Sequence, residues 1–347
     1  RLLIQLFQEL GYAYECGYDV ERDYRNPYYE RDLREALHRL NPMLSEEVLN
    51  EAFRLITHVN EGVLEQRNEQ LMDYLQNGVE VKYTEGGRSK TALVNLINYD
   101  SPLQNHFKVA NQWSVVEYDK IRCDLVVFIN GLPLVVIELK SPTREEASDE
   151  DAYLQIKQYQ QKCPSLFVYN AFSVISDQLI SKAGTITAKE NRYMEWKSVD
   201  GTVETNAIAD YETFFNGIFK RERLIDILQN FICFDHKDGK IAKIMGAYHQ
   251  YFAVNKALVK TDTAIGGDGK IGVFWHTQGS GKSLSMVFYV HRLIQLYPQC
   301  TIVVVTDRND LDQQLYEQFA GCQKFIRQEP QRVGFDLNEK GKLTKTA

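Results

Sequence analysis

Hydrophobic residues recur at the 3.6-residue spacing of an amphipathic helix through residues 1–80. These segments end at residues that stop a helix, such as Gly11 and Gly78, and Ser45 has the N-cap position of one of them. The pattern therefore predicts four helices, over residues 2–10, 32–40, 45–58 and 63–76.

Downstream of these helices the hydrophobic pattern changes to a period of two, which is typical of strands. Strands are expected over residues 91–97, 105–113, 123–129 and 134–140. A charged helix follows at about 145–162 and is closed by Pro164. The apolar runs 166–169 and 172–176 then indicate a strand that returns to the same sheet. With a further helical stretch at 211–231, these elements predict an α/β fold, a mixed sheet flanked by helices.

The last third of the chain has a different organisation. After a linker and a helix at about 247–258, a glycine-rich loop at 265–269 precedes a strand, loop, helix, strand and helix between residues 271 and 319. A chain of 347 residues is too long for one ordinary core. We therefore divide it into two domains, 1–234 and 235–347.

The composition is that of a folded protein, with 44% hydrophobic and 12% aromatic residues. It has neither a run of about 18 apolar residues nor a signal-peptide pattern, so we expect a cytoplasmic protein without a membrane anchor. The six cysteines form no CxxC pair, which indicates reduced thiols rather than a zinc site or a disulfide framework. The net charge of −7 neither supports nor excludes nucleic acid as a partner. The first residue is Arg1 rather than Met, so we expect a piece of a longer protein.

Three polar residues, Asp124, Glu138 and Lys140, interrupt the apolar strands around the hairpin signal Asn130-Gly131. If residues 130–132 form a three-residue loop, Asp124 lies directly opposite Glu138, with Cβ atoms about 5 Å apart. Lys140 then projects from the same face as Glu138. A two-residue loop would put Asp124 and Glu138 on opposite faces, so the proposed site depends on the strand register.

Such a group has the chemistry that metal-dependent phosphodiester cleavage requires, because carboxylates hold the ion and a cation or base lies beside the attacking water. The alternative is ordinary exposed charges at strand ends, with Asp124 and Lys140 paired, and an isolated ExK tripeptide favours it. Glu138, however, follows the apolar run 134–137. A carboxylate in a buried strand is costly unless a metal or a partner satisfies it.

Gln155 and Tyr159 are four residues apart and share one face of the next helix, where they either join this group or are polar residues of a solvated surface. With Asp124 and the Glu138-Leu139-Lys140 triplet, they resemble the PD-(D/E)xK nuclease core and its QxxxY extension. Two surrounding segments also resemble the N-terminal domain of type I restriction enzyme motor (R) subunits: 105–112 and 130–133.

The resemblance implies metal binding by Asp124 and Glu138 and a catalytic role for Lys140. It also implies that Gln155 and Tyr159 orient DNA or support the site. The family also uses an acidic residue on its first helix. Glu9 is the candidate in this chain, and we leave that position open.

A second motif, residues 277–283 (Thr-Gln-Gly-Ser-Gly-Lys-Ser), follows an apolar run and opens a helix. Glycines let backbone N–H groups surround phosphate, and the helix N-terminus adds a favourable dipole. Lys282 would reach the outer phosphates of ATP, and Ser283 would bind Mg²⁺. His276 stands where the strict P-loop pattern has glycine, but the string resembles motif I of type I motor subunits. A plain Gly/Ser turn between strand and helix is the alternative.

Upstream, residues 248–251 resemble the adenine-reading Q motif of superfamily 2 motors, although a plain surface glutamine explains Gln250 equally well. The residues assigned to nucleotide binding are Gln250, Thr277, Gly279, Ser280, Gly281, Lys282 and Ser283. After the expected strand at 301–306 we find neither the second carboxylate pair of a motor nor its arginine finger. We therefore expect this chain to bind nucleotide without turning it over.

These observations predict a PD-(D/E)xK nuclease domain followed by part of a RecA-like P-loop domain of a type I restriction subunit. The resemblance implies Mg²⁺-dependent cleavage of double-stranded DNA coupled to ATP-dependent translocation, in a complex with modification (methyltransferase) and specificity subunits. A recombination-type helicase–nuclease is one alternative, but its nuclease would follow the motor. A DNA-binding scaffold with an inactive nuclease-like fold is another, against which the intact Asp124, Glu138 and Lys140 argue.

Overall fold

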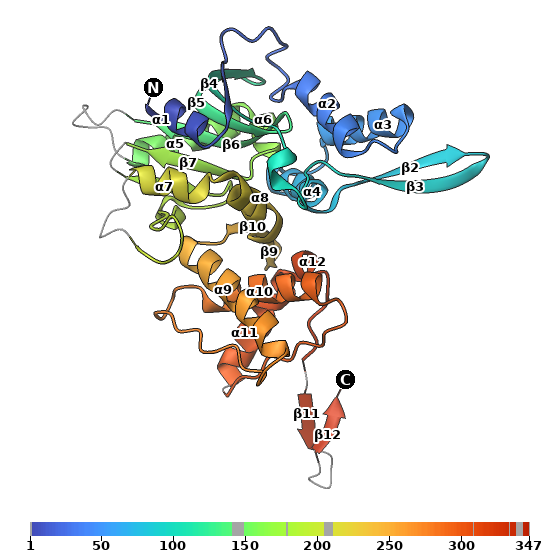
Figure 1. The fold of residues 1–347 in the computed structure, drawn as a ribbon, viewed down its shortest axis with the longest axis vertical. Coiled ribbons are helices and arrows are strands. Elements are labelled where there is room, and N and C mark those ends of the chain that lie inside the picture. Colours follow the sequence, from blue (N-terminus) through green and yellow to red (C-terminus); the bar gives the residue numbers. More distant parts are fainter. Residues whose placement is uncertain are drawn as a thin grey trace. The chain divides into compact units, whose positions relative to one another are not determined.

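The computed structural model describes residues 2–140, 149–177, 180–204, 211–307, 309–332, 334–337 and 343–346. The chain forms two compact units (Figure 1). One comprises Arg1–Ile232 and Lys243–His249, and the other comprises Cys233–Ala242 and Gln250–Ala347. Within the described residues, no helix is long and apolar enough to cross a membrane.

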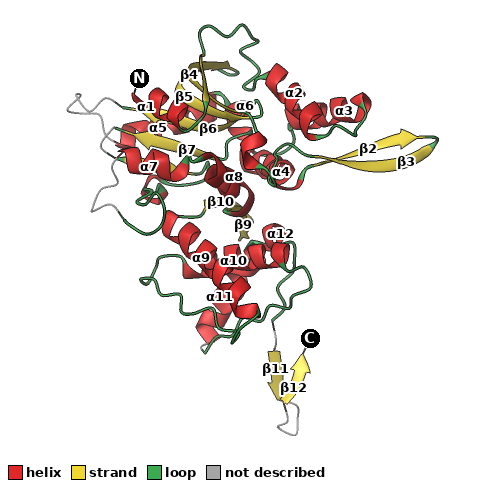
Figure 2. Ribbon diagram, viewed as in Figure 1, coloured by secondary structure: helices red, strands yellow, loops and turns green. Residues whose placement is uncertain are grey.

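The first unit mixes helices and strands along the chain (Figure 2). Its helices are α1 (Leu2–Glu9), α2 (Glu30–Leu40), α3 (Glu46–Thr57), α4 (Leu64–Asn77), α5 (Asp149–Lys162), α6 (Pro164–Val168), α7 (Tyr211–Ile218) and α8 (Arg221–Asn230). Its strands are β1 (Ala13–Cys16), β2 (Val79–Glu85), β3 (Arg88–Val94), β4 (Phe107–Val116), β5 (Lys120–Ile129), β6 (Leu132–Leu139), β7 (Phe172–Ser176) and β8 (Ser181–Gly184). The hairpin β9 (Ile232–Lys237) and β10 (Lys240–Met245) follows.

The four expected N-terminal helices form close to their predicted bounds. Ser45 is the N-cap of α3, where its hydroxyl accepts a hydrogen bond from the backbone N–H of Val48 at 3.4 Å. Gly78, with φ of 85°, ends α4. Local signals therefore set these helices, because their hydrogen bonds join residues only four apart.

A six-stranded mixed sheet is the centre of the first unit, with strand order β1-β4-β5-β6-β7-β8. Strands β4, β5 and β6 form an antiparallel meander. Strand β1 lies parallel to β4 at one side, and β7 lies parallel to β6 at the other. The predicted mixed sheet flanked by helices is therefore present.

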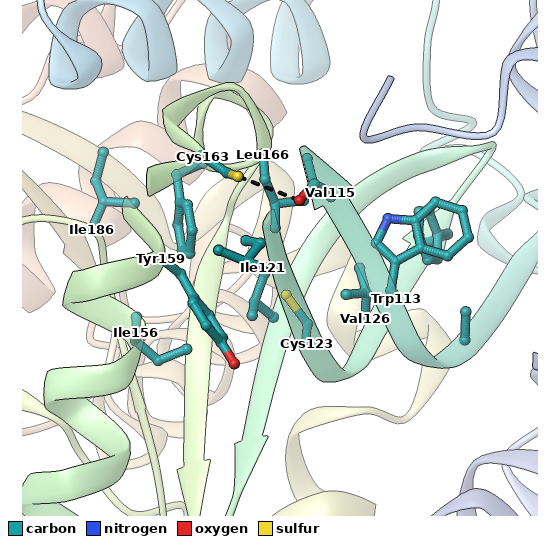
Figure 3. Packing of buried hydrophobic residues seen from close by; sticks show 14 of the residues in the cluster. Trp113, Val115, Ile121, Cys123, Val126, Ile156, Tyr159, Cys163, Leu166 and Ile186 are labelled. Atoms are coloured by element: carbon teal, nitrogen blue, oxygen red, sulfur yellow. Dashed lines mark hydrogen bonds between the residues drawn. The ribbon is translucent and has the colours of Figure 1, made fainter. Parts of the chain in front are cut away.

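Helices α5 and α6 cover one face of this sheet and bury a continuous apolar cluster between helix and strands (Figure 3). Trp113 of β4 is at the centre of this core, with its ring 4.8 Å from Phe128 and 4.7 Å from Tyr29. Its indole N–H is also satisfied, because it donates to the carbonyl of Pro27 at 3.2 Å. The thiol of Cys163, just after α5, donates to the carbonyl of Val115 at 3.6 Å. These contacts fix α5 against the strands that carry the candidate site.

Aromatic residues pack against the opposite face of the sheet. Phe7 of α1 lies 5.0 Å from Phe219 and 6.0 Å from Phe215, which belong to the α7–α8 region. Phe219 in turn lies 6.0 Å from Phe172 of β7. The hydroxyl of Tyr12 donates to the carbonyl of Phe219 at 2.8 Å. Both faces of the central strands are thus buried, as their continuous apolar sequences predict.

Three local expectations were wrong. Residues 166–169 belong mainly to the short helix α6 rather than to a strand, because Pro164 begins a helix there and Cys163 ends α5. The connection between β5 and β6 is a two-residue turn, not the three-residue loop expected, since Ile129 pairs with Leu132. Strands β1, β2, β8, β9, β10, β11 (Gly334–Leu337) and β12 (Leu343–Thr346) were not predicted.

The C-terminal elements are α9 (Tyr248–Ile265), α10 (Lys282–Leu296), α11 (Asn309–Gly321), α12 (Gln323–Ile326), β11 (Gly334–Leu337) and β12 (Leu343–Thr346). Strands expected over 271–276 and 301–306 do not form in this described part of the chain. A strand needs a neighbouring strand to accept its hydrogen bonds, and neither segment pairs with one here. Their apolar side chains are correspondingly exposed, for example Val273 at 94% and Val305 at 86%.

The turn between β5 and β6 provides a test of the fold. Gly131 has φ of 84°, and a Cβ added there would lie 2.6 Å from the backbone nitrogen of Leu33 and 2.7 Å from the carbonyl oxygen of Tyr29. Gly131→Ala should therefore lower the free energy of unfolding by more than the roughly 1–2 kcal/mol that the left-handed backbone conformation alone costs an alanine. Gly86→Ala, at φ of 58° with nothing within 4 Å, is the matched control for that conformational cost alone. Equal losses for both variants in urea denaturation would contradict the close packing at Gly131.

Candidate functional site

A β-bulge sets the register of the two strands that carry the candidate site. Near the turn, Phe128 pairs with Pro133, but beyond the irregularity Val127 pairs with Val135, so Leu134 is the extra residue. Leu125 and Ile137 continue the shifted register. A two-residue turn alone would put Asp124 and Glu138 on opposite faces, and the inserted residue reverses that. The register in which Asp124 faces Glu138 is therefore continued as far as the pair Leu125–Ile137, and the bulge, rather than a three-residue loop, produces it.

Asp124 and the end of β6 are in direct contact. The backbone N–H of Leu139 donates to Asp124 Oδ2 at 2.9 Å. The half-buried Asp124 carboxylate therefore lies where β6 ends. One oxygen of the carboxylate is held by the backbone, which leaves the other available to a ligand.

Glu138 is almost completely buried, with 2% of its surface exposed. Its Oε1 atom lies 3.4 Å from the Lys140 ammonium, while Oε2 has no hydrogen-bond partner among the described residues. Burial, and then the neighbouring charge of Asp124, raise the pKa of Glu138 to about 8, although Lys140 opposes the shift. An unpartnered oxygen of a buried carboxylate is costly, and a bound cation would satisfy it.

Helix α5 supplies Gln155 and Tyr159 to the same group. The Lys140 ammonium donates to Gln155 Oε1, and Gln155 Nε2 donates to the Tyr159 hydroxyl at 2.6 Å. The Tyr159 hydroxyl donates to the carbonyl of Arg122 in β5 at 2.9 Å. Figure 3 shows the Tyr159 ring reaching from α5 toward the strand that carries Cys123, the residue before Asp124. A chain of hydrogen bonds thus fixes Lys140 from the helix and anchors the helix to β5.

The two carboxylates fit a divalent cation, since carboxylate oxygens are the usual ligands of Mg²⁺. The described residues contain no group of three or more His, Cys, Asp or Glu side chains that could hold a metal. Glu9, the open candidate for a further acidic residue, is exposed at the end of α1. The remaining ligand positions of an ion would go to water or substrate, as is common for Mg²⁺.

The predicted phosphate loop in the second unit leads into α10. Gly279 and Gly281 have φ of 81° and 80°, and Gly281 is the N-cap of the helix that begins at Lys282. The Lys282 ammonium donates to the carbonyls of His276 at 2.8 Å and Thr277 at 2.9 Å. The backbone of the loop therefore folds around the Lys282 side chain.

Gln250 of α9 contacts the same loop, because its Nε2 donates to the Gly281 carbonyl at 3.0 Å. Ser280, whose backbone N–H donates to the Thr277 carbonyl at 3.3 Å, lies within the turn, and Ser283 is the second residue of α10. The structure thus brings Gln250 to the predicted nucleotide-binding residues. At the first site, nothing in the sequence indicated that the backbone carbonyl of Arg122 would accept the hydrogen bond from Tyr159.

Comparison with known proteins gives the family. The family model described as type I restriction enzyme R protein N terminus matches residues 1–192, and a SWI2/SNF2 ATPase model matches residues 249–345. The type I restriction enzyme HindI endonuclease subunit of Haemophilus influenzae is 38% identical over 96% of this chain and 33% of its own length. A putative type I restriction enzyme MjaIXP endonuclease subunit of Methanocaldococcus jannaschii is 33% identical over 91% of this chain.

The mixed α/β sheet brings Asp124 of β5 to the end of β6, where Glu138 and Lys140 lie. The chain belongs to the type I restriction enzyme R protein family, as the sequence resemblance predicted. It spans about a third of the length of these two relatives.

The raised pKa of Glu138 makes a prediction about stability. The unfolded state releases this proton near pH 4.5 and the folded state near pH 8, so the stability that the protonated group contributes is present below about pH 4.5 and lost as pH rises to about 8. Without metal, the wild type should lose unfolding free energy on the order of a few kcal/mol relative to Glu138→Gln over this range. Urea titrations in EDTA at several pH values measure the difference. Parallel curves of unfolding free energy against pH for the two proteins would contradict the buried, unsatisfied carboxylate. Added Mg²⁺ should reduce the difference in unfolding free energy between them.

The hydroxyl of Tyr159 can be tested with a matched tyrosine on the same helix. Tyr159→Phe removes the bonds to Gln155 and to the Arg122 carbonyl, so it should lower the free energy of unfolding by about 1 kcal/mol. Tyr153→Phe removes a weaker bond of 3.4 Å to the Ala188 carbonyl and should cost less. Equal losses for the two variants in urea denaturation would contradict the hydrogen-bond chain from Tyr159 to β5.

Proposed function

We propose that this chain is the nuclease part, with the beginning of the motor, of the restriction subunit of a type I restriction–modification system. The activity proposed for the full-length protein is Mg²⁺-dependent cleavage of double-stranded DNA coupled to ATP-dependent translocation, in the cytoplasm. The observation that carries the proposal is the buried Glu138 at the end of β6. It lies 3.4 Å from the Lys140 ammonium, and the N–H of the next residue, Leu139, donates to Asp124 at 2.9 Å. The names of the relatives, which are type I restriction endonuclease subunits, support it.

Each residue of the site has a role that follows from its chemistry. Asp124 and Glu138 would hold Mg²⁺ through their free oxygens, and the bound ion supplies charge neutralisation at the phosphate. Lys140 would stabilise negative charge that develops on the phosphate during attack. Gln155 and Tyr159 would keep the Lys140 ammonium in position, since they link it to the backbone of β5. Preorganised charges of this kind act most strongly in a buried site.

For the second unit we propose the binding of ATP with Mg²⁺. The residues from Gly279 to Ser283 would surround the phosphates, Lys282 would exchange its loop carbonyls for phosphate oxygens, and Ser283 would bind the ion. Gln250 would support the loop through its bond to the Gly281 carbonyl. We further propose that residues 1–234 form a PD-(D/E)xK nuclease fold and that 235–347 begin a RecA-like domain. Modification and specificity subunits are the proposed partners and would supply recognition of the DNA site.

The two sites can be separated by substitution in the full-length protein assembled with its partner subunits. Asp124→Ala and Glu138→Ala should abolish DNA cleavage and leave ATP hydrolysis intact, because only the carboxylates hold the cleaving ion. Lys282→Ala should abolish ATP hydrolysis. Asp119→Ala removes a carboxylate just before β5 that pairs with Lys162 at 2.8 Å and accepts from the Lys120 N–H at 2.8 Å, so it serves as the matched control and should cleave normally.

Plasmid nicking and phosphate release measure the two activities. Cleavage that persists in both carboxylate variants would rule out the site. A wild-type complex that binds DNA without metal-dependent nicking would instead favour the scaffold with an inactive nuclease-like fold.

A further inference from the structure

The hairpin of β2 and β3 extends away from the helices of the first unit (Figure 1). The two strands form a sheet of their own, with seven residue pairs from Val79↔Val94 to Glu85↔Arg88. At the base of the hairpin, where it packs against α3, one face is buried: Val79, Val81, Ala92 and Val94. Residues 82–91, which we call the hairpin tip, are exposed apart from the half-buried Tyr83.

The hairpin tip is polar and basic. Its charged residues are three cations and one carboxylate: Lys82, Arg88, Lys90 and Glu85. The tip therefore has a net charge of +2, whereas the whole chain has a net charge of −7. Its other exposed side chains carry hydroxyl groups: Thr84, Ser89 and Thr91. The structure describes every residue of the tip and exposes no large apolar side chain there, so this surface suits a polar partner with negative charge.

Two of the three cations in the hairpin tip are unpaired. Among the residues that the structure describes, Lys82 and Arg88 form no ion pair, and only the Lys90 ammonium contacts the Glu85 carboxylate. Other exposed cations around α2 and α3 are paired with carboxylates: Arg25 with Asp23, Arg31 with Glu35, and Arg54 with Glu51. An unpaired cation gives up no carboxylate partner when it binds a phosphate. The tip is therefore better suited to a polyanion than these arginines are.

The shape of the hairpin tip also fits duplex DNA. Its two strands are joined by the two-residue turn Gly86-Gly87, so the tip is a narrow ribbon. The DNA major groove is about 12 Å wide and admits a two-stranded β-ribbon. Protein contacts to DNA phosphates come from Arg and Lys and from the hydroxyls of Ser, Thr and Tyr, which are the side chains of this segment. A second protein would have to pair with a strand edge, and lysines on an edge strand oppose such pairing.

We propose that the hairpin tip binds double-stranded DNA, with Lys82, Arg88 and Lys90 against backbone phosphates. Phosphate contacts carry no sequence information directly, so this binding is independent of the DNA sequence. The hairpin is then a DNA-binding element in addition to the carboxylate site of β5 and β6. The inference rests on the proposed function in one respect, since DNA is the substrate of that function.

Removal of the three cations together tests the proposal by its salt dependence. The variant is Lys82→Ala with Arg88→Ala and Lys90→Ala in the full-length protein. Its slope of log affinity against log salt concentration for duplex DNA should fall in magnitude by about 2 to 3, because each phosphate contact contributes about 0.9. Its dissociation constant at about 0.1 M salt should rise at least about tenfold. Fluorescence anisotropy with duplexes of two unrelated sequences, in EDTA and without nucleotide, measures both quantities.

A charge change of the opposite sign provides a second variant. Glu85→Ala leaves the Lys90 ammonium without its carboxylate, so it should tighten DNA binding and increase the magnitude of the salt slope by up to about 1. The side chains of both variants are exposed, so the melting temperature should stay at the wild-type value. An unchanged melting temperature separates the loss of DNA contacts from a loss of folding.

The matched control removes three exposed arginines from the same unit: Arg25→Ala with Arg31→Ala and Arg54→Ala. It should keep the wild-type affinity and salt slope. Equal losses in the two triple variants overturn the proposal, as does a hairpin variant that binds DNA like the wild type. Unchanged DNA affinity with lost assembly of the restriction complex also overturns it, and assigns the hairpin to a protein partner.

The outcome for Asp124→Ala keeps the hairpin proposal distinct from the proposed function. If the restriction complex with Asp124→Ala still cleaves DNA, the proposed nuclease site fails, whatever the hairpin variant does. An inactive Asp124→Ala complex beside wild-type DNA binding by the triple hairpin variant overturns only the role of the hairpin tip.

Discussion

The single inserted residue in β6 is the constraint on which the candidate site depends. Side chains alternate between the two faces of a strand, so a shift of one residue moves every later side chain to the other face. After the two-residue turn at Asn130-Gly131, the bulge at Leu134 makes this shift once, between the turn and the site. It brings Asp124 and Glu138 to one face and lets the Leu139 N–H reach Asp124. The turn is itself fixed by tertiary packing, because Gly131 lies against the backbone of α2.

The electrostatics of the site follow from that geometry. Glu138 lies in a strand buried on both faces, and burial with a second carboxylate nearby disfavours its ionised form. Lys140 offsets part of this cost, and its own position is fixed by Gln155 and, through it, by Tyr159. The core beneath them, with Trp113 at its centre, holds α5 and the strands rigidly. The fold thus holds two carboxyl groups close together, and a bound cation would favour the ionised form of both.

The two units differ in how completely their strands are paired. In the first unit every strand of the central sheet pairs with at least one other strand, and Lys140 is held by the Ser176 carbonyl of β7 and by Gln155 of α5. In the described part of the second unit, α10 forms directly after Gly281, whereas 271–276 and 301–306 have no strand partner. Helices satisfy their hydrogen bonds internally and strands do not, so the same chain has well-formed helices beside unpaired apolar segments.

The sequence by itself determined the N-terminal helices, the apolar strands of the central sheet, the family, and the set of residues proposed for both sites. These features depend on residues near one another in the chain, such as the N-cap Ser45 and the turn glycines, or on motifs with a fixed spacing. Only the tertiary structure decided the bulge at Leu134, the edge strand β1, the left-handed Gln112 and the bond from Tyr159 to the Arg122 carbonyl. Strand β1 and the Tyr159 bond join segments distant in sequence, and the bulge and the left-handed Gln112 are backbone irregularities. In all four, backbone hydrogen bonding and packing, rather than residue type, select the conformation.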